Sequence, residues 1–290
     1  MNILSKLRKP WFIHNPFLIA KALFFELGLV YKGWVKVKTC FGVMINCDTS
    51  KVIGKVLYKN GVYELPTSEL MWRLLKQEPD SLFVDVGANI GYYSLLARQR
   101  QGNLGEVISF EPVPDIYEKL LGNLEGLGVK TYQYAVSNES GSAQINIPKG
   151  SDSNDGISTL QHCVNAIDSF KVQTVSLDKF LDKSIFILKI DIEGHEFSAL
   201  SGASSLLANG KIRHIVFEEH DVEHSSVVAL LANNGYSIYS IGWDLNGLIL
   251  KPLGEKNKLY VLDAPNFIAS RDIAGVINAI SPGWTILQRK

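Results

Sequence analysis

One stretch of the chain decides its fold: Leu82-Phe83-Val84-Asp85-Val86-Gly87-Ala88-Asn89-Ile90-Gly91-Tyr92-Tyr93-Ser94. A short apolar run with an acid near its end leads into a turn with two glycines, and the next residues have helical spacing. This pattern predicts a strand, a tight turn and a helix. Glycines let a backbone approach a ligand closely, and open α/β sheets bind ligands at the carboxyl ends of their strands. The stretch therefore predicts one half of a nucleotide-binding crevice.

A second strand is predicted at 106–111, and it ends in Glu111. An acid roughly 20 positions beyond a glycine turn of this kind is placed to accept hydrogen bonds from ribose hydroxyls. We therefore expect a ligand with an adenosine-like moiety.

Two ligand classes fit such a crevice. A dinucleotide needs a glycine in the middle of the turn, where this chain has Asn89, and the Asp85 carboxylate would repel a pyrophosphate. The same carboxylate would attract an ammonium or sulfonium group, so S-adenosylmethionine is the better match and an NAD-type oxidoreductase is the alternative. The predicted cofactor-binding residues of this crevice are Asp85, Gly87, Ala88, Asn89, Gly91 and Glu111.

Three motifs occur in order along the chain: the run from Phe83 to Gly91, then Phe110-Glu111-Pro112, then Leu188-Lys189-Ile190-Asp191-Ile192-Glu193-Gly194-His195-Glu196. On these motifs, from about Gly61 to His220, the chain resembles the FkbM family of S-adenosylmethionine-dependent methyltransferases. The resemblance implies an α/β fold with a Rossmann-like, doubly wound, mostly parallel seven-stranded sheet (class I methyltransferase). It also implies an enzyme that methylates hydroxyl groups of sugars or natural products.

The predicted elements alternate as such a sheet requires. A helix over 1–33 and an antiparallel sheet within 34–63 form a small N-terminal helix plus β cover, and a helix at 67–75 follows. We expect this cover at 1–75, the methyltransferase domain at 76–265 and a C-terminal segment at 266–290. The expected strands of the domain are 82–86, 106–111, 130–136, 142–147, 171–175, 185–192, 212–219, 236–241 and 258–263, and its expected helices are 116–124, 194–200 and 222–233.

The resemblance adds further site residues. Tyr63 and Glu64 are similar to a family element that ends the cover near the cofactor, and Ala135 is expected beside the adenine. A polar, glycine-containing loop at 149–159 is long enough to predict a lid. Within it, Ser158 and Thr159 resemble a recurrent family feature and are expected to face the substrate.

The strand at 185–192 carries charges where a central parallel strand should be apolar. Lys189 and Asp191 fall on one face of it. Burial of both costs several kcal/mol unless they are paired, which marks a functional site or a structural ion pair. We expect Asp191 to be the base that removes the proton of the acceptor hydroxyl, with Lys189 orienting it.

Further polar residues follow the strand ends. His195 and His220 are alternative bases, and Glu193 and Glu218 are assigned to the substrate. These acids and histidines could also bind a divalent metal, but their spacing is not diagnostic and no metal site is assigned. A non-catalytic binding module on the same fold is a further alternative, because a fold does not fix a function.

The composition of the chain limits the kinds of molecule that it is expected to bind. The chain has 290 residues, 46% of them hydrophobic, and its 29 basic and 29 acidic residues balance, which excludes a global attraction to nucleic acid. Three cysteines without a disulfide framework indicate the cytoplasm. We expect a small-molecule or glycan acceptor and no nucleic acid. The basic, aromatic N-terminal helix is interpreted as an amphipathic helix packed on the domain, and the alternative is a weak membrane-surface association through it. The sequence gives no oligomeric state.

Overall fold

Strand β3 (Leu82–Val86), the strand of the decisive stretch, is buried along its whole length. The computed structural model describes residues 9–148, 166–244, 246–254 and 265–288. In it, β3 runs parallel to β4 (Glu106–Phe110) on one side and to β9 (Ile185–Ile190) on the other. The charged residues of β3 and β9 are Asp85 and Lys189, and these two are direct neighbours in the register of the pair.

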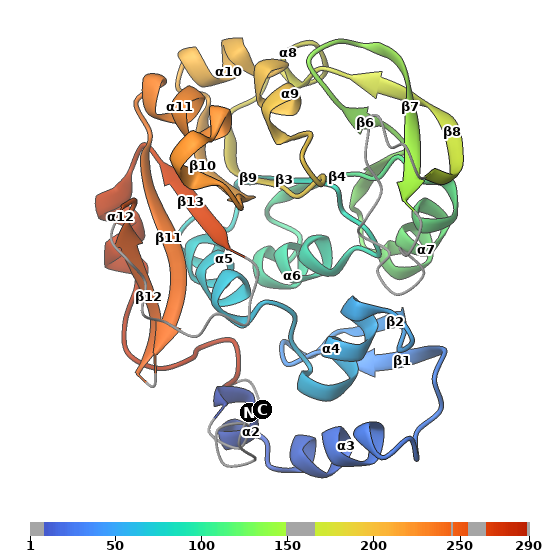
Figure 1. The fold of residues 1–290 in the computed structure, drawn as a ribbon. Helices are drawn as coiled ribbons and strands as arrows, with labels where there is room; N and C mark the ends of the chain where they lie inside the picture. The colour runs from blue at the N-terminus through green and yellow to red at the C-terminus, as the bar shows by residue number, and fades with distance from the viewer. Residues whose placement is uncertain (1–8, 149–165, 245, 255–264, 289–290) are drawn as a thin grey trace.

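The central sheet has eight strands in the order β12-β11-β13-β10-β9-β3-β4-β5 (Figure 1). Strands β5, β4, β3, β9 and β10 are parallel, whereas β13 is antiparallel to both of its neighbours. The sheet exceeds the expected seven strands because β12 forms a hairpin with β11. The other members of the sheet are β5 (Lys130–Tyr132), β10 (Ile212–Glu218), β11 (Ser237–Asp244), β12 (Gly247–Pro252) and β13 (Asn266–Ser270).

Helices cover both faces of this sheet (Figure 1). One apolar layer contains the helices α5 (Leu65–Gln77), α6 (Tyr92–Gln101), α7 (Pro114–Leu124) and α12 (Ile273–Ala279). The other contains α8 (Leu177–Phe180), α9 (Glu196–Ser201), α10 (Ser204–Ala208) and α11 (Ser226–Asn233). Since both layers exclude water from the parallel strands, the open ends of these strands are left to bind ligands.

Two predicted elements differ from the structure, and a third lies outside the described residues. The strand at 130–136 is divided, because β5 pairs with β4 whereas β6 (Ala135–Val136) joins β7 (Gly141–Pro148) and β8 (Ala166–Val175) in a second sheet. The helix at 222–233 is a 3₁₀ turn, η2 (Val222–His224), followed by α11, because Ser225 caps α11 by accepting a hydrogen bond from the Val228 N–H at 3.1 Å. The strand predicted at 258–263 lies outside the described residues, and β13 belongs to the segment expected at 266–290.

The N-terminal part contains α2 (Pro10–His14), α3 (Phe17–Glu26), β1 (Trp34–Lys38), β2 (Met44–Asp48) and α4 (Val52–Asn60). The single helix predicted over 1–33 is therefore wrong, since Pro16 starts a new helix and Gly28 has a φ of 71° just beyond its end. The antiparallel pairing of β1 and β2 is confirmed. The residues expected to extend this sheet instead form α4, which ends at Gly61, where φ is 70°.

A buried ion pair fastens residues 279–286 to α5. The Arg73 guanidinium donates to the fully buried Glu69 carboxylate, to the carbonyl oxygen of Ser281 at 3.0 Å and to that of Gly283 at 2.8 Å. Glu69 in turn accepts from the Thr285 N–H at 2.8 Å. The pair therefore satisfies backbone groups that would otherwise be buried without partners.

Candidate active site

The turn after β3 touches the exit of β9. Gly87 has a φ of 76°, and a Cβ at this position would lie 2.0 Å from the carbonyl oxygen of Asp191. The Asp191 N–H donates to the Val86 carbonyl at 3.1 Å. The glycine therefore lets the two strand ends meet, and it brings Asp191 next to the turn.

Asp85 lies at the buried end of β3. Its Oδ2 accepts a hydrogen bond from the Ser94 hydroxyl at 2.6 Å, and that hydroxyl lies 2.7 Å from the Ser109 hydroxyl. Within the described part of the chain its Oδ1 has no hydrogen-bond partner, although it is buried. Burial raises the pKa of Asp85, and the charge of Lys189 opposes this rise. A buried acceptor without a donor suits the N–H or cationic group of a ligand.

Glu111 follows β4 and is 5% exposed. Its Oε2 accepts from the Asn89 N–H at 3.0 Å and its Oε1 from the Val113 N–H at 3.0 Å. Burial raises its pKa to about 7, and the two N–H groups lower it. Each oxygen keeps a second lone pair, so this carboxylate can accept two hydroxyl groups of a ribose. Asn89 has a φ of 50° and donates backbone N–H here, which explains how the turn works without the middle glycine.

Lys189 and Asp191 form the predicted pair, with 2.9 Å between Lys189 Nζ and Asp191 Oδ2. The Lys189 side chain is 3% exposed and that of Asp191 is 32% exposed. Burial lowers the pKa of Lys189, but the carboxylates of Asp191, Asp85 and Glu64 outweigh burial, so that the net change is a rise. The ammonium also lies 4.7 Å from the centre of the Tyr93 ring. It is therefore a fixed cation shared by acids from three elements.

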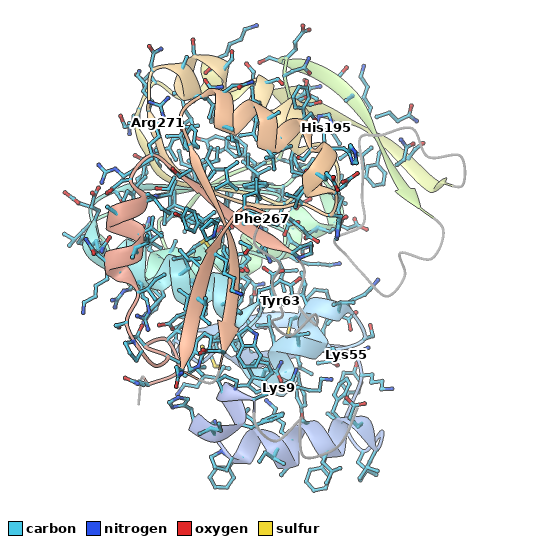
Figure 2. All side chains as sticks on the ribbon, turned by 60° about the vertical axis from the view of Figure 1, so that its left-hand side comes forward. Lys9, Lys55, Tyr63, His195, Phe267 and Arg271 are labelled. Atoms are coloured by element: carbon cyan, nitrogen blue, oxygen red, sulfur yellow. The ribbon has the colours of Figure 1, made fainter. Side chains whose placement is uncertain are left out.

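The cover contributes Glu64 to this group. Glu64 has a φ of 41° and accepts a hydrogen bond from the Tyr93 hydroxyl, and its side chain also interacts with Asn266. Burial and the charge of Asp191 raise its pKa to about 7. The neighbouring Tyr63 lies where the cover meets the central sheet (Figure 2). A strained backbone held by side-chain contacts is typical of functional sites.

Two further acids, Glu193 and Glu218, lie near Asp191, and we call these three residues the acidic rim. Glu193, with a φ of 47°, has its pKa raised to about 7 by burial and by the charges of Asp191 and Glu218. Glu218, at the end of β10, contacts His220, with 2.9 Å between Oε1 and Nε2. The strand tips of β9 and β10 thus place exposed and half-exposed carboxylates beside the Lys189–Asp191 pair.

Two further predicted residues lie beside the second sheet. His195 precedes α9, and its Nε2 is 3.0 Å from the Ser137 hydroxyl, beside the second sheet and away from Tyr63 (Figure 2). Burial lowers its pKa. Ala135 is buried in β6, opposite Thr174 of β8. Ser158 and Thr159 lie outside the described residues. Across the described ranges, no three histidine, cysteine or acidic side chains are arranged to hold a metal ion.

Sequence reasoning missed Tyr93 and Asn266. Tyr93 follows the glycine turn and contacts both Glu64 and Lys189, but it has the apolar helical spacing of a core residue. Asn266 is the first residue of β13 and is opposite Glu218 in the register. The pairing of β13 with β10 brings it into the site.

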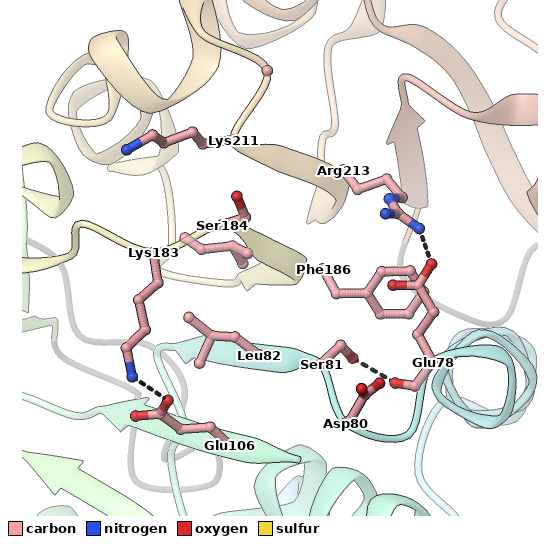
Figure 3. A pocket seen from close by; sticks show the side chains of 12 residues that line it. Glu78, Asp80, Ser81, Leu82, Glu106, Lys183, Ser184, Phe186, Lys211 and Arg213 are labelled. Carbon is pink, nitrogen blue, oxygen red and sulfur yellow. Dashed lines mark hydrogen bonds and ion pairs between the residues drawn. The ribbon is translucent and has the colours of Figure 1, made fainter. Parts of the chain in front are cut away.

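A separate cavity of about 450 Å³ lies at the opposite edge of the sheet, where the parallel strands begin (Figure 3). Two ion pairs lie in its lining: Lys183 Nζ lies 2.7 Å from Glu106 Oε2, and Arg213 contacts Glu78. Since it is remote from Asp85, it takes no part in the site described above.

The geometry agrees with the comparison with known protein families. The methyltransferase FkbM domain matches residues 85–238, which is more than half of the chain. This chain belongs to that family. As an FkbM methyltransferase it uses S-adenosylmethionine, and the family assignment decides against the oxidoreductase and the non-catalytic binding module. The unpartnered Asp85 Oδ1 and the remaining lone pairs of Glu111 fit the amino and ribose groups of this cofactor.

This FkbM methyltransferase is similar to the hexuronic acid methyltransferase AglP of Haloferax volcanii, with 27% identity over 222 residues that cover 69% of this chain and 85% of AglP. Among solved structures, the methyltransferase FkbM of Methylobacillus flagellatus KT is 16% identical with a TM-score of 0.41, and the match covers 66% of this chain but only 44% of that one. An S-adenosylmethionine-dependent O-methyltransferase of Thermotoga maritima is 12% identical with a TM-score of 0.45, covering 72% of this chain and 66% of that one.

Proposed function

We propose that this FkbM methyltransferase methylates a hydroxyl group of a sugar, with a hexuronic acid-containing glycan as the acceptor class. The name of the relative from Haloferax volcanii supports the sugar. The pair of Lys189 and Asp191, 2.9 Å apart at the tip of β9, carries the proposal for a hydroxyl. A cytoplasmic location belongs to the same proposal.

S-adenosylmethionine, when bound, supplies a methyl group on a sulfonium leaving group. Asp85 and Glu111 would hold its amino and ribose groups. Lys189 donates a hydrogen bond to Oδ2 of Asp191. Among the described residues, no other hydrogen bond to this side chain is present. Oδ1 is thus available to accept the proton of the acceptor hydroxyl. Alignment of the two reacting atoms supplies roughly 7 to 11 kcal/mol in well-oriented reactions.

The acidic rim favours a neutral acceptor atom over a carboxylate. A hexuronic acid offers both hydroxyl oxygens and a carboxylate oxygen to a methyl donor. Asp191, Glu193 and Glu218 would repel a carboxylate near the β9 tip, whereas a hydroxyl can donate a hydrogen bond to them. The expected product is therefore a methyl ether and not a methyl ester.

The test is transfer of a labelled methyl group to oligosaccharides that contain hexuronic acid. We expect a product that survives mild alkali, which cleaves esters but leaves ethers intact. Asp191→Asn should lose transfer by about 100-fold or more, as expected for a general base, while calorimetry shows unchanged binding of S-adenosylhomocysteine. Asp221→Asn is the matched control, since within the described residues this exposed carboxylate on the same edge pairs with groups of its own turn.

Either of two results would remove the proposal. An alkali-labile product would assign the carboxylate as acceptor, and full activity in Asp191→Asn would exclude this residue as the base. Loss of cofactor binding in the same variant would instead give Asp191 a role in holding the cofactor.

A further inference from the structure

Helices α2 and α3 lie at one end of the molecule, beyond β1, β2 and α4 (Figure 1). Of the fourteen exposed large apolar side chains in the described part of the chain, seven lie between residues 13 and 31. Phe17 is 87% exposed and Tyr31 is 70% exposed. We call this set the apolar band, and it consists of Ile13, Phe17, Leu23, Phe24, Leu27, Leu29 and Tyr31. Clusters of this kind mark interaction surfaces.

Helix α3 is apolar on both of its sides. Phe25 on the inner side is buried and packs on Tyr58, with 5.6 Å between the ring centres. Leu23 and Phe24 on the outer side are at least half exposed. A helix that meets only water on one side carries polar residues there, whereas a helix that is apolar all round is covered on every side. The outer side therefore fits an apolar partner.

The charges around the apolar band indicate which partner this is. Residues 9–38 contain five lysines and one acid, Glu26, whereas the whole chain is balanced. Glu26 is itself paired with Lys59 at 2.9 Å, and Lys6 and Arg8 precede this segment in the sequence. Lysine is depleted in interfaces between proteins, but it is attracted to anionic lipid head groups. Aromatic and aliphatic side chains next to lysines are the residue types with which a protein surface binds the interface of an anionic membrane.

A cavity next to the apolar band has the same mixed character. It has a volume of about 770 Å³ and extends from α2 and α3 to the loop between β1 and β2. Phe17 and Phe41 contribute apolar walls, and Lys21 and Lys38 contribute cations. Apolar walls beside ammonium groups match an aliphatic chain attached to an anionic head group.

We propose that the apolar band binds the surface of a membrane that contains anionic phospholipids, with α3 lying in the interface. In the described ranges, no helix is long and apolar enough to cross a bilayer, and the proposal requires only the in-plane mode of binding. It does not depend on the identity of the methyl acceptor.

The test is co-sedimentation of the full chain with vesicles of phosphatidylglycerol and phosphatidylcholine, compared with vesicles of phosphatidylcholine alone. We expect binding to the anionic vesicles that weakens as salt is raised to about 0.5 M. The double variant Phe17→Ser/Leu23→Ser should bind at least about tenfold more weakly, since two apolar side chains no longer enter the interface. Leu104→Ser/Ile277→Ser is the matched control and should bind like the parent, because it removes exposed apolar side chains elsewhere.

Three outcomes would overturn the proposal. The first is no binding of the parent chain to anionic vesicles, and the second is equal binding to neutral vesicles at all salt concentrations. The third is a dimer in sedimentation velocity without lipid that Phe17→Ser/Leu23→Ser dissociates, which would assign the apolar band to a second copy of the chain. Thermal unfolding checks that both double variants stay folded, and the parent chain alone decides the first two outcomes.

Discussion

Replacement of Gly87 by alanine should separate the tips of β3 and β9. The added Cβ would lie 2.0 Å from the Asp191 carbonyl oxygen, and real Cβ contacts are not shorter than 3.0 Å, so one backbone must move by at least about 1 Å. This displacement breaks the hydrogen bond from Asp191 N–H to Val86, worth about 0.5 to 1.5 kcal/mol. The positive φ adds about 1 to 2 kcal/mol. We expect a total destabilisation of about 1.5 to 3.5 kcal/mol.

The same displacement moves Asp191, and a misplacement of about 1 Å can cost about 100-fold in rate. Chemical denaturation measures the stability, and methyl transfer measures the rate. Gly126→Ala is the matched control, because Gly126 has a φ of 71° but no atom within 4 Å of an added Cβ. If Gly87→Ala loses no more stability than Gly126→Ala and keeps its activity, then the contact between the two strand tips does not position the site.

Two further predictions concern buried charges. Arg73→Met should lower the free energy of unfolding by about 3 to 5 kcal/mol, because Glu69 is left buried without its cation. Arg213→Met, which removes a partner from an exposed pair, should change it by less than about 1 kcal/mol. Urea denaturation measures both changes, and similar losses in the two variants would refute the role of burial. Burial raises the pKa of Glu111 from 4.5 to about 7, so the folded chain binds a proton that the unfolded chain releases between these pH values. The contribution of Glu111 to stability therefore falls as the pH rises from 4.5 to about 7. Glu111→Gln should show a smaller fall between about pH 5 and pH 8, and an unchanged pH dependence would contradict this.

Local patterns predicted the centre of this fold well. The strand, turn and helix around Gly87 follow from an apolar run and from glycines at positive φ, which are properties of neighbouring residues. Lys189 and Asp191 were recognisable as a site because charges in a buried parallel strand need partners. These inferences needed no knowledge of which distant segments meet.

Long-range pairing was not predictable in the same way. Asn266 reaches the site only because β13 inserts between β10 and β11, a pairing that no local spacing encodes. The segment 52–60 falls within the range 34–63, for which the alternation around Val35 and Val37 predicts a sheet, but it forms a helix whose Leu57 packs in the core. The helix predicted at the N-terminus is interrupted at Pro16. Apolar residues have helical spacing on both sides of this proline, so the spacing did not indicate the interruption.

The position of β13 has a consequence for how the chain assembles. β10 and β11 are synthesised before β13. In the finished sheet they do not pair with each other, because β13 (residues 266–270) lies between them. Until it arrives, the half-built sheet exposes two unpaired edges that are open to strand exchange or aggregation. The ion pair of Arg73 and Glu69 binds residues 279–286, which follow β13 in the sequence. We therefore expect completion of the sheet and docking of these residues on α5 to occur together, late in folding.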